Sequence, residues 1–226
     1  APAIGVVFEP LSHSERLNTY AKLCGGGRVS FFNGEMDTLL EELQVCGPTL
    51  FISVPRFWNV LYGEFNKIVA LYRKHLPDKG PRAAEGLARQ LFESLMGGRI
   101  TYAATGGAPT SPAVLQWMYG FGFIVSESYG SMEVGGITSS KRFSSELQFK
   151  LVDVPEMGYT SQDKPFPRGE LCIKSTTMFS GYHNNEQETN EAFIEGGFFR
   201  TGDIVQLEGP ESVKIIDRKK FIFKLA

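Results

Sequence analysis

The sequence has no uninterrupted apolar run of the about 18 residues that a membrane-spanning helix needs. It also lacks a basic segment followed by an apolar one at its start, the pattern of a secretory signal peptide. Neither sign of charge dominates, because 23 lysines and arginines face 25 aspartates and glutamates, for a formal charge of −2. The sequence therefore predicts a cytoplasmic protein with no membrane span and no nucleic-acid-binding surface.

Cysteine and histidine are scarce, with three residues of each. Both are scattered along the chain and no C-x-x-C pair occurs, so neither a structural zinc site nor a disulfide framework is expected. The cysteines are expected to be free, buried thiols in a reducing compartment. They are Cys24, Cys46 and Cys172.

The chain of 226 residues, 42% of them hydrophobic, can bury a core as one large domain or two small ones. Its 25 glycines and 12 prolines indicate many turns rather than a helical bundle.

Residues 1–140 alternate between short apolar runs and longer amphipathic stretches. In 35–46, apolar side chains recur at i, i+3, i+4 and i+7, the spacing of a helix with one buried face, and Gly47-Pro48 is a typical helix end. This alternation predicts an α/β fold with a mostly parallel sheet flanked by helices. The expected strands are 28–32, 49–54, 99–105 and 121–126, and the expected helices are 14–23, 35–46, 56–75, 83–96 and 113–119.

Beyond about residue 147 the pattern changes to short alternating strands separated by proline, glycine and asparagine. Residues 147–216 therefore predict a small antiparallel β sheet or barrel, with one helix at 185–193. The boundary between the two domains is expected at 138–146, a stretch rich in serine, lysine and arginine.

Two loops are expected at carboxyl ends of strands, where ligands bind in open sheets of this kind. The first, 105–109, joins a strand to a helix, and its paired glycines let a ligand approach the backbone. The second, 128–133, offers the ring of Tyr129 to a flat base and the Glu133 carboxylate to Mg²⁺. Taken alone, each is a weak signal that an ordinary polar turn also explains.

Two charged segments in the second half could contact a nucleotide. In Arg200-Thr201-Gly202-Asp203, an acidic residue presented from a glycine turn could accept hydrogen bonds from a ribose, although Gly-Asp is also ordinary turn chemistry. The run Asp217-Arg218-Lys219-Lys220 indicates by itself only a solvated charged surface.

In combination, the order and spacing of five segments resemble the adenylate-forming superfamily of acyl-CoA synthetases, peptide-synthetase adenylation domains and luciferases. The five are TGGAP at 105–109, YGSME at 129–133, GELCIKSTTMFSGYHNNEQET at 169–189, FFRTGD at 198–203 and IIDRKKFIFKLA at 215–226. Segments 10–17 and 54–62 look like its long-chain acyl-activating members, and 150–171 looks most like carboxylic acid reductases and related fatty acid ligases.

The resemblance implies that the chain is part of the large N-terminal domain of an adenylating enzyme. In this family the carboxylate of an acid attacks the α-phosphate of ATP, which gives an acyl-adenylate and pyrophosphate, and a thiol then displaces AMP. The resemblance would place the 105–109 loop along the adenine, with Tyr129 on its other face. The residues that it implies around the nucleotide are Gly106, Gly107, Ala108, Pro109, Tyr129, Gly130, Met132, Asp203 and Arg218.

The resemblance also implies individual roles. Asp203 would accept hydrogen bonds from the ribose hydroxyls, supported by Arg218, and Glu133 would hold the Mg²⁺ that bridges the ATP phosphates. Lys220 falls at the hinge, in a segment 217–226 that would lead to the family's small C-terminal domain. That domain, with its catalytic lysine, is expected after residue 226, and the family's phosphate loop is expected before residue 1.

Three residues are implied as catalytic groups: Glu133, Ser131 and His13. His13 matches a position near the acyl pocket and could orient the carboxylate, or it could be a structural histidine. Trp58 is expected to pack the core rather than line an acyl tunnel.

One position departs from the family. Met132 stands where the family usually has a threonine that contacts the α-phosphate, and methionine cannot donate that hydrogen bond. Ser131 could compensate through its hydroxyl. The departure predicts weaker adenylation than in a relative that carries threonine.

The expected function is ATP-dependent activation of a fatty or aromatic carboxylic acid and its transfer to the thiol of CoA or phosphopantetheine. A carboxylic acid reductase is favoured, in which a carrier domain and an NADPH-dependent reductase follow. One alternative is a stand-alone AMP- or ATP-binding module or pseudoenzyme, and another is a structural interaction domain.

Overall fold

The structure is a computed structural model that describes residues 2–9 and 15–219. It divides the chain into two compact units, residues 1–127 and 128–226, so the division precedes the change in composition at 138–146. His13 and Lys220 lie outside the described residues. Each unit is described below by itself.

The first unit is built on a sheet with the strand order β2-β1-β3-β4-β5. Strand β1 pairs parallel with β2 and β3, and β3 pairs parallel with β4, which confirms the parallel sheet. The sequence analysis did not predict β1. The strands are β1 (Ile4–Val7), β2 (Arg28–Phe31), β3 (Leu50–Ser53), β4 (Tyr102–Gly106) and β5 (Ile124–Ser131).

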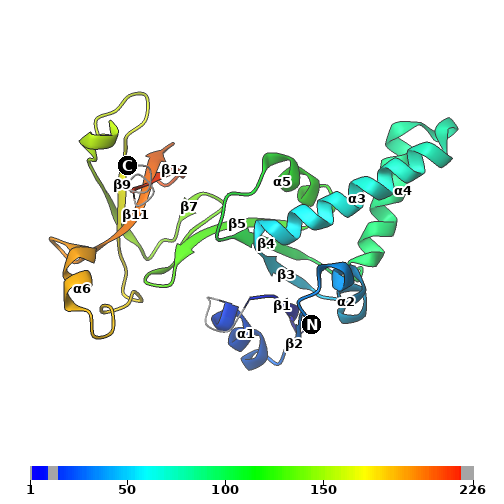
Figure 1. Ribbon diagram of the computed structural model, residues 1–226, viewed down its shortest axis with the longest axis horizontal. Coiled ribbons are helices and arrows are strands. Elements are labelled where there is room, and N and C mark those ends of the chain that lie inside the picture. The colour runs from blue at the N-terminus through cyan, green and yellow to red at the C-terminus, as the bar shows by residue number, and fades with distance from the viewer. Residues whose placement is uncertain (1, 10–14, 220–226) are drawn as a thin grey trace. The chain divides into compact units, whose positions relative to one another are not determined.

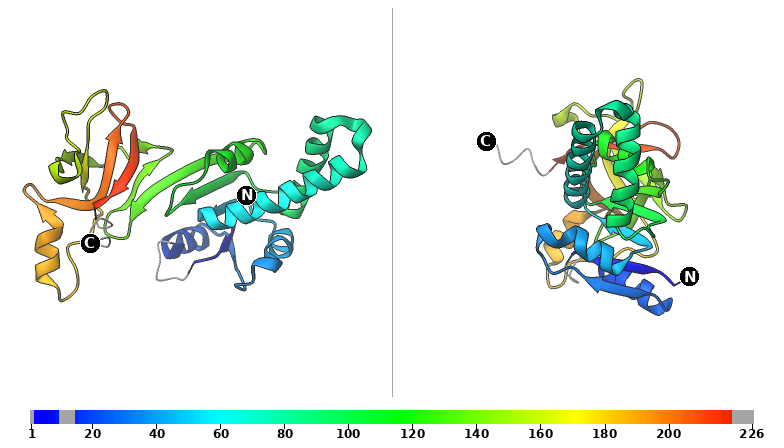
Figure 2. Two further views of the ribbon diagram at one scale, coloured as in Figure 1. Left: turned by 45° about the horizontal axis from the view of Figure 1, so that its top comes forward. Right: turned by 90° about the vertical axis from the view of Figure 1, so that its right-hand side faces the viewer.

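In the described part of this unit, five helices accompany the sheet, and α3 and α4 lie side by side (Figures 1 and 2). Their ends follow the sequence: Gly47 adopts a φ of 55° after α2, and the Ser111 hydroxyl accepts a hydrogen bond from the Val114 N–H at the start of α5. The helices are α1 (Glu15–Cys24), α2 (Leu39–Cys46), α3 (Pro55–His75), α4 (Gly80–Leu95) and α5 (Pro112–Tyr119), with 3₁₀ turns η1 (Met36–Thr38) and η2 (Pro77–Lys79).

The core of the first unit contains many aromatic rings. Trp58 is fully buried, contacts Phe51 edge-to-face at 4.7 Å between ring centroids, and donates its indole N–H to the carbonyl of Ala104 at 3.0 Å. This position confirms Trp58 as a core residue. Because Ala104 lies on β4, the hydrogen bond also fixes the strand from which the 105–109 loop emerges.

Helix α1 turns polar side chains inward. Glu15 and Lys22 are buried and form an ion pair at 3.2 Å, while Leu17 and Tyr20 on the same helix are more than half exposed. The Lys22 side chain packs on Gly5 of β1, where an added Cβ would come within 2.8 Å of Lys22 Cε.

The second unit contains the end of β5, a β5–β6–β7 antiparallel ribbon and a five-stranded antiparallel sheet. The sheet has the order β10-β11-β9-β8, with β12 paired to β11, and confirms the predicted small antiparallel sheet. These strands are β6 (Gly135–Ser139), β7 (Arg142–Phe143), β8 (Gln148–Val152), β9 (Arg168–Lys174), β10 (Phe193–Ile194), β11 (Phe198–Leu207) and β12 (Val213–Arg218).

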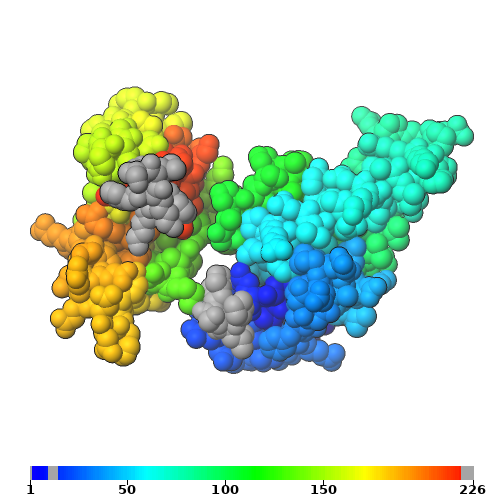
Figure 3. Space-filling model, viewed as in Figure 1, coloured from blue at the N-terminus to red at the C-terminus, as the bar shows by residue number. Residues whose placement is uncertain are grey.

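A second hydrophobic core joins the ribbon to this sheet. Val134 and Ile137 of the ribbon pack with Leu171, Ile173 and other apolar residues of the sheet. The 3₁₀ turn η3 (Pro155–Met157) follows β8, and the exposed helix α6 (Glu186–Ala192), orange in Figure 3, lies on the surface of this unit.

Among the described residues, no helix combines the length and apolar character needed to cross a bilayer.

Candidate functional site

The segment Arg200–Asp203 lies inside strand β11 rather than in the glycine turn that the sequence suggests. The pairing of β11 with β9 shifts register between Arg200 and Ile204, and Gly202 has a φ of 72°. The Thr201 hydroxyl donates to the Leu171 carbonyl and accepts from the Asp203 N–H. The segment is thus a β-bulge, a feature that redirects side chains without ending the strand.

Three predicted site residues from different strands meet at the Asp203 carboxylate. Tyr129 donates its hydroxyl to Oδ2 at 2.6 Å, and Arg218 donates its Nε to Oδ1 at 2.7 Å. Asp203 is only 4% exposed, whereas Arg218 lies largely in solvent. The predicted ribose acceptor, its arginine and the predicted adenine neighbour therefore form one hydrogen-bonded cluster, the Asp203 cluster.

The surroundings of the Tyr129 hydroxyl favour its protonated form. Burial, and next to it the negative charge of Asp203, raise the pKa of the Tyr129 hydroxyl. Both favour the neutral phenol, which therefore remains a hydrogen-bond donor at physiological pH.

A second buried carboxylate, Glu170 on β9, lies on the neighbouring strand. It is 2% exposed and contacts Arg200 at 2.6 Å and Lys219 at 3.3 Å. Together the two carboxylates hold both Arg218 and Lys219 at the end of β12. The sequence did not single out Glu170, although it lies within the segments that carry the resemblance.

Glu133 follows β5 in the same unit. Its Oε1 accepts a hydrogen bond from the Tyr182 hydroxyl at 3.1 Å, and its backbone carbonyl accepts one from the Phe179 N–H at 2.7 Å. Burial and the adjacent Glu133 charge raise the pKa of Tyr182 to about 12. Sequence reasoning missed Tyr182, because nothing in a local pattern relates positions that far apart.

The Glu133 carboxylate fits Mg²⁺ chemically. Within the described part of the chain, Tyr182 is its only hydrogen-bond partner, so Oε2 is left for a cation. No group of three or more histidines, cysteines, aspartates or glutamates among the described residues could hold a metal ion alone. One carboxylate with the remaining ligands from phosphate and water is an arrangement that Mg²⁺ accepts.

Residues 130–132 differ from the loop expected there. Strand β5 continues to Ser131, and an added Cβ on Gly130 would collide with the Gly135 carbonyl of β6. The Ser131 Oγ is buried without a hydrogen-bond partner in the described part, while Met132 is 52% exposed. Gly130 thus permits close strand pairing, and the Ser131 hydroxyl is covered rather than open to a phosphate.

The 105–109 loop in the first unit joins β4 to α5, as predicted. Thr105 and Thr110 share a hydrogen bond of 2.7 Å between their hydroxyls, and the Thr110 N–H donates to Glu127. Gly107 has a φ of 78°, which strains any other residue. The loop that contains Gly106, Gly107, Ala108 and Pro109 is therefore a fixed turn at the end of a strand.

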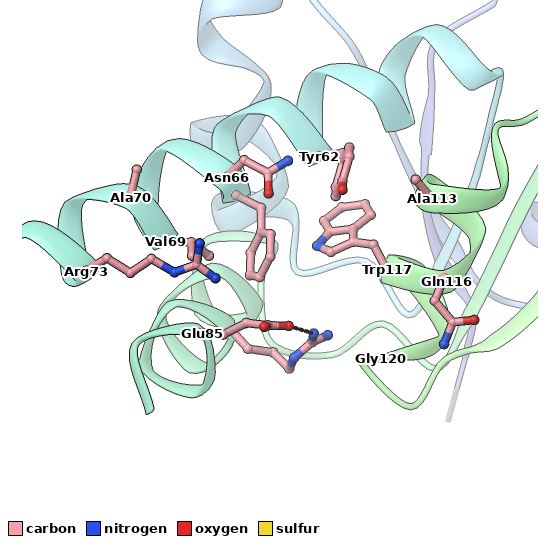
Figure 4. A pocket seen from close by; sticks show the side chains of 12 residues that line it. Tyr62, Asn66, Val69, Ala70, Arg73, Glu85, Ala113, Gln116, Trp117 and Gly120 are labelled. Carbon is pink, nitrogen blue, oxygen red and sulfur yellow. Dashed lines mark hydrogen bonds and ion pairs between the residues drawn. The ribbon is translucent and has the colours of Figure 1, made fainter. Parts of the chain in front are cut away.

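A separate pocket of about 720 Å³ lies among α3, α4 and α5 of the first unit (Figure 4). Tyr62 and Trp117 line it together with Asn66 and Arg73 (Figure 4). Arg89 and Glu85 also line it and form an ion pair at 3.1 Å. None of the residues predicted to contact a ligand lines this pocket.

The three cysteines are free, as predicted. Their expected burial holds for Cys172 but is wrong for Cys24, which is exposed at the end of α1. Burial, followed by the Glu170 charge, raises the pKa of Cys172 to about 11.

Comparisons with known proteins identify a family and similar proteins of known activity. The family described as "AMP-binding enzyme" matches residues 4–183. The chain is 38% identical to a carboxylic acid reductase of Mycobacterium tuberculosis over 233 residues, covering all of this chain and 20% of that protein. It is 34% identical to the peroxisomal long chain acyl-CoA synthetase 7 of Arabidopsis thaliana over 251 residues, covering 98% of this chain and 36% of that protein.

Solved structures show the same fold. The adenylation domain of a carboxylate reductase from Mycobacterium chelonae superposes with a TM-score of 0.87 at 35% identity, over 97% of this chain and 35% of that one. The A-PCP didomain of the carboxylic acid reductase from Segniliparus rugosus, solved in complex with AMP, gives 0.87 at 36% identity, over 97% and 31%. The chain thus spans about a fifth to a third of the length of these relatives.

Proposed function

The chain belongs to the AMP-binding enzyme family, and from this premise we propose that it carries the nucleotide-binding part of an enzyme that activates a carboxylic acid as an acyl-adenylate. The observation that carries the proposal is the Asp203 cluster. A buried carboxylate with two fixed donors, presented by a β-bulge, is a preorganised acceptor for the hydroxyls of a ribose. An ionised carboxylate has room for further donors, because it offers about four acceptor positions.

In the proposed reaction, a carboxylate oxygen of the acid attacks the α-phosphorus of ATP and pyrophosphate leaves. Catalysis of such transfers depends mainly on positioning and on neutralising charge. The chain would supply positioning through Asp203 and Arg218 at the ribose, Tyr129 and the 105–109 loop at the adenine, and His13 at the acid. Glu133 would hold Mg²⁺, which supplies positive charge to the phosphate oxygens when bound.

We assign the whole protein to the carboxylic acid reductase type, which extends the similarity to the Mycobacterium tuberculosis reductase. The acyl group would then pass to a phosphopantetheine thiol of a carrier domain and on to an NADPH-dependent reductase. Transfer to CoA, suggested by the similarity to the Arabidopsis synthetase, is the other outcome. Lys220 would be the hinge before a small C-terminal domain, and the protein would be cytoplasmic.

Pyrophosphate exchange tests the proposal in the complete natural protein. ATP, MgCl₂ and radiolabelled pyrophosphate are incubated with a panel of fatty and aromatic acids. We expect acid-dependent formation of labelled ATP, and the identity of the best acid gives the substrate class. Product assays with CoA, or with NADPH after phosphopantetheinylation, separate the two thiol acceptors.

A nucleotide-binding module without catalysis is the second candidate. It is favoured by Met132 and by the covered hydroxyl of Ser131, which together leave this position without an accessible hydroxyl donor. Calorimetry with AMP discriminates the two functions. AMP binding without exchange for any acid favours the module, whereas binding with exchange favours the enzyme.

A further inference from the structure

We propose that Tyr182 is a positioning residue that holds the Glu133 carboxylate in the orientation needed to bind Mg²⁺·ATP. The inference rests on the proposed function, because Glu133 is assigned to Mg²⁺ there. Its basis is the hydrogen bond of 3.1 Å from the Tyr182 hydroxyl to Glu133 Oε1. Both residues belong to the second unit.

The segment before Tyr182 is fixed to the core of this unit. The Phe179 ring packs against Phe193 and Phe199 at centroid distances of 5.6 and 5.3 Å, and against the ring of Tyr182 at 4.9 Å. The Phe179 N–H also donates to the backbone carbonyl of Glu133 at 2.7 Å. The backbone of the metal-binding residue and the segment that carries Tyr182 are thus linked directly.

The segment after Tyr182 is fixed to helix α6. The Tyr182 N–H donates to the Thr189 hydroxyl at 2.9 Å, and that hydroxyl donates to the Asn185 carbonyl at 2.8 Å. Gly181 fits closely against Thr189, where an added Cβ would come within 2.7 Å of Cγ2. With anchors on both sides, the phenol cannot move away from Glu133 without breaking these contacts.

A fixed hydrogen-bond donor on one carboxylate oxygen sets the direction in which the other oxygen points, and so whether it can bind a cation. With Oε1 bound to Tyr182, rotation of the Glu133 carboxylate is restricted and Oε2 is presented to the cation. Side chains that orient a metal ligand in this way typically change metal affinity by about 10- to 100-fold when they are replaced. The phenylalanine variant removes only the hydroxyl and keeps the ring contact with Phe179.

The test measures metal binding without turnover. Mn²⁺·ATP binding to the complete natural protein is followed by water proton relaxation in the absence of any acid, and metal-free AMP binding is followed by calorimetry. For Tyr182→Phe we expect Mn²⁺·ATP affinity to fall by about 10-fold, with AMP affinity unchanged because Asp203 and Arg218 are intact. In exchange assays the Mg²⁺ concentration for half-maximal rate should rise by a similar factor.

Tyr159→Phe is the matched control. Tyr159 lies in the same unit, its ring contacts Arg168, and its hydroxyl has no hydrogen bond to another described residue. Both affinities should stay at the wild-type value. In a Glu133→Gln background, Tyr182→Phe should have no further effect on Mn²⁺·ATP binding, because the hydroxyl acts only through that carboxylate.

Two results would overturn the inference while the proposed function stands. One is wild-type Mn²⁺·ATP affinity in Tyr182→Phe. The other is an equal loss of Mn²⁺·ATP and AMP affinity, which indicates a general structural role. A wild-type protein that binds neither AMP nor Mn²⁺·ATP would overturn the proposed function and the inference together.

Discussion

At the scale of single residues, the Asp203 carboxylate accepts hydrogen bonds from two side chains in the described part of the chain. Oδ2 accepts from the Tyr129 hydroxyl and Oδ1 from the Arg218 guanidinium, which has no acceptor of its own. An amide in its place would turn an NH₂ group toward one of them. We therefore expect Asp203 to contribute both to nucleotide binding and to the stability of the second unit.

Asp203→Asn should weaken AMP binding by about 10-fold or more, the value of a hydrogen bond to a charged group, and should lower the free energy of unfolding by about 1–3 kcal/mol. Calorimetry and urea denaturation measure the two effects. Asp153→Asn is the control, since Asp153 is exposed and its carboxylate accepts a hydrogen bond from the Ser161 N–H. Wild-type AMP affinity in Asp203→Asn would contradict the ribose assignment.

Met132→Thr should increase the rate of adenylation. Met132 is 52% exposed, so the change costs little packing, and it restores a hydroxyl that the covered Ser131 side chain does not supply. A donor to developing negative charge can change a rate by about 10-fold or more. The adenylation rate is measured by pyrophosphate-release kinetics in the complete natural protein. Met157→Thr is the control and should keep the wild-type rate. An unchanged or lower kcat would refute this explanation of the departure.

At the scale of elements, two irregularities in strands place the candidate residues. The register of β5 against β6 shifts between Tyr129 and Gly130, and that of β11 against β9 shifts around Gly202. Each shift lies beside a member of the Asp203 cluster. Bulges of this kind are common next to functional sites because they redirect side chains while the sheet continues.

Gly130→Ala should destabilise the second unit, because the new methyl group would meet the Gly135 carbonyl and force β5 and β6 apart. We expect a loss of about 1–3 kcal/mol, as for other overpacked positions. Urea denaturation provides the measurement. Gly136→Ala is matched to it, since that position has open space and an ordinary φ, and its stability should be close to wild type. Equal stability of the two variants would contradict the steric role of Gly130.

The elements that the sequence predicted were those with a strong period or a clear terminal signal. The helix at 56–75 and the strand at 49–54 appear close to their expected bounds, as α3 and β3. The segment 198–203 was misread as containing a turn because a bulge glycine and a turn glycine look alike in sequence. Only the pairing partner, here β9, distinguishes them.

At the scale of the whole molecule, alkaline pH should reduce stability. Cys172 has its pKa raised from 9.0 to about 11, and Tyr129 also has a raised pKa. Above about pH 9 the unfolded chain loses these protons while the folded protein retains them, so unfolding is favoured. Tm should therefore be steady near neutral pH and fall from about pH 9 upward.

Thermal unfolding between about pH 7 and 11 checks this expectation. Cys172→Ala should flatten the first part of the decline, whereas Cys24→Ala, at an exposed position, should leave the profile unchanged. A decline of the same slope in both variants would show that Cys172 does not contribute.

The fold class of the molecule could be predicted from the sequence, but the contacts between residues far apart in the sequence could not. The alternation of strand and helix predicted for 1–140 and the short strands predicted for 147–216 follow from local periodicity. The meeting of Tyr129 with Asp203 and Arg218 was suggested only by resemblance, because no local pattern relates Tyr129 to Asp203, which lies 74 residues away. Tyr182 and Glu170 lie within the segment 169–189, but their hydrogen-bond and ion-pair partners became evident only in the folded chain.

The packing of helix α1 against β1 predicts that three positions, 5, 15 and 22, vary together among homologues. Lys22 occupies the volume that any side chain at position 5 would need, and it also neutralises the buried Glu15. A side chain at position 5 would therefore force the end of the Lys22 side chain to move away from its place beside Glu15, and a loss of Lys22 alone leaves a buried carboxylate without its ion-pair partner. In an alignment of homologues, these three positions should covary as a set, with glycine at 5 appearing wherever the lysine and glutamate are both kept.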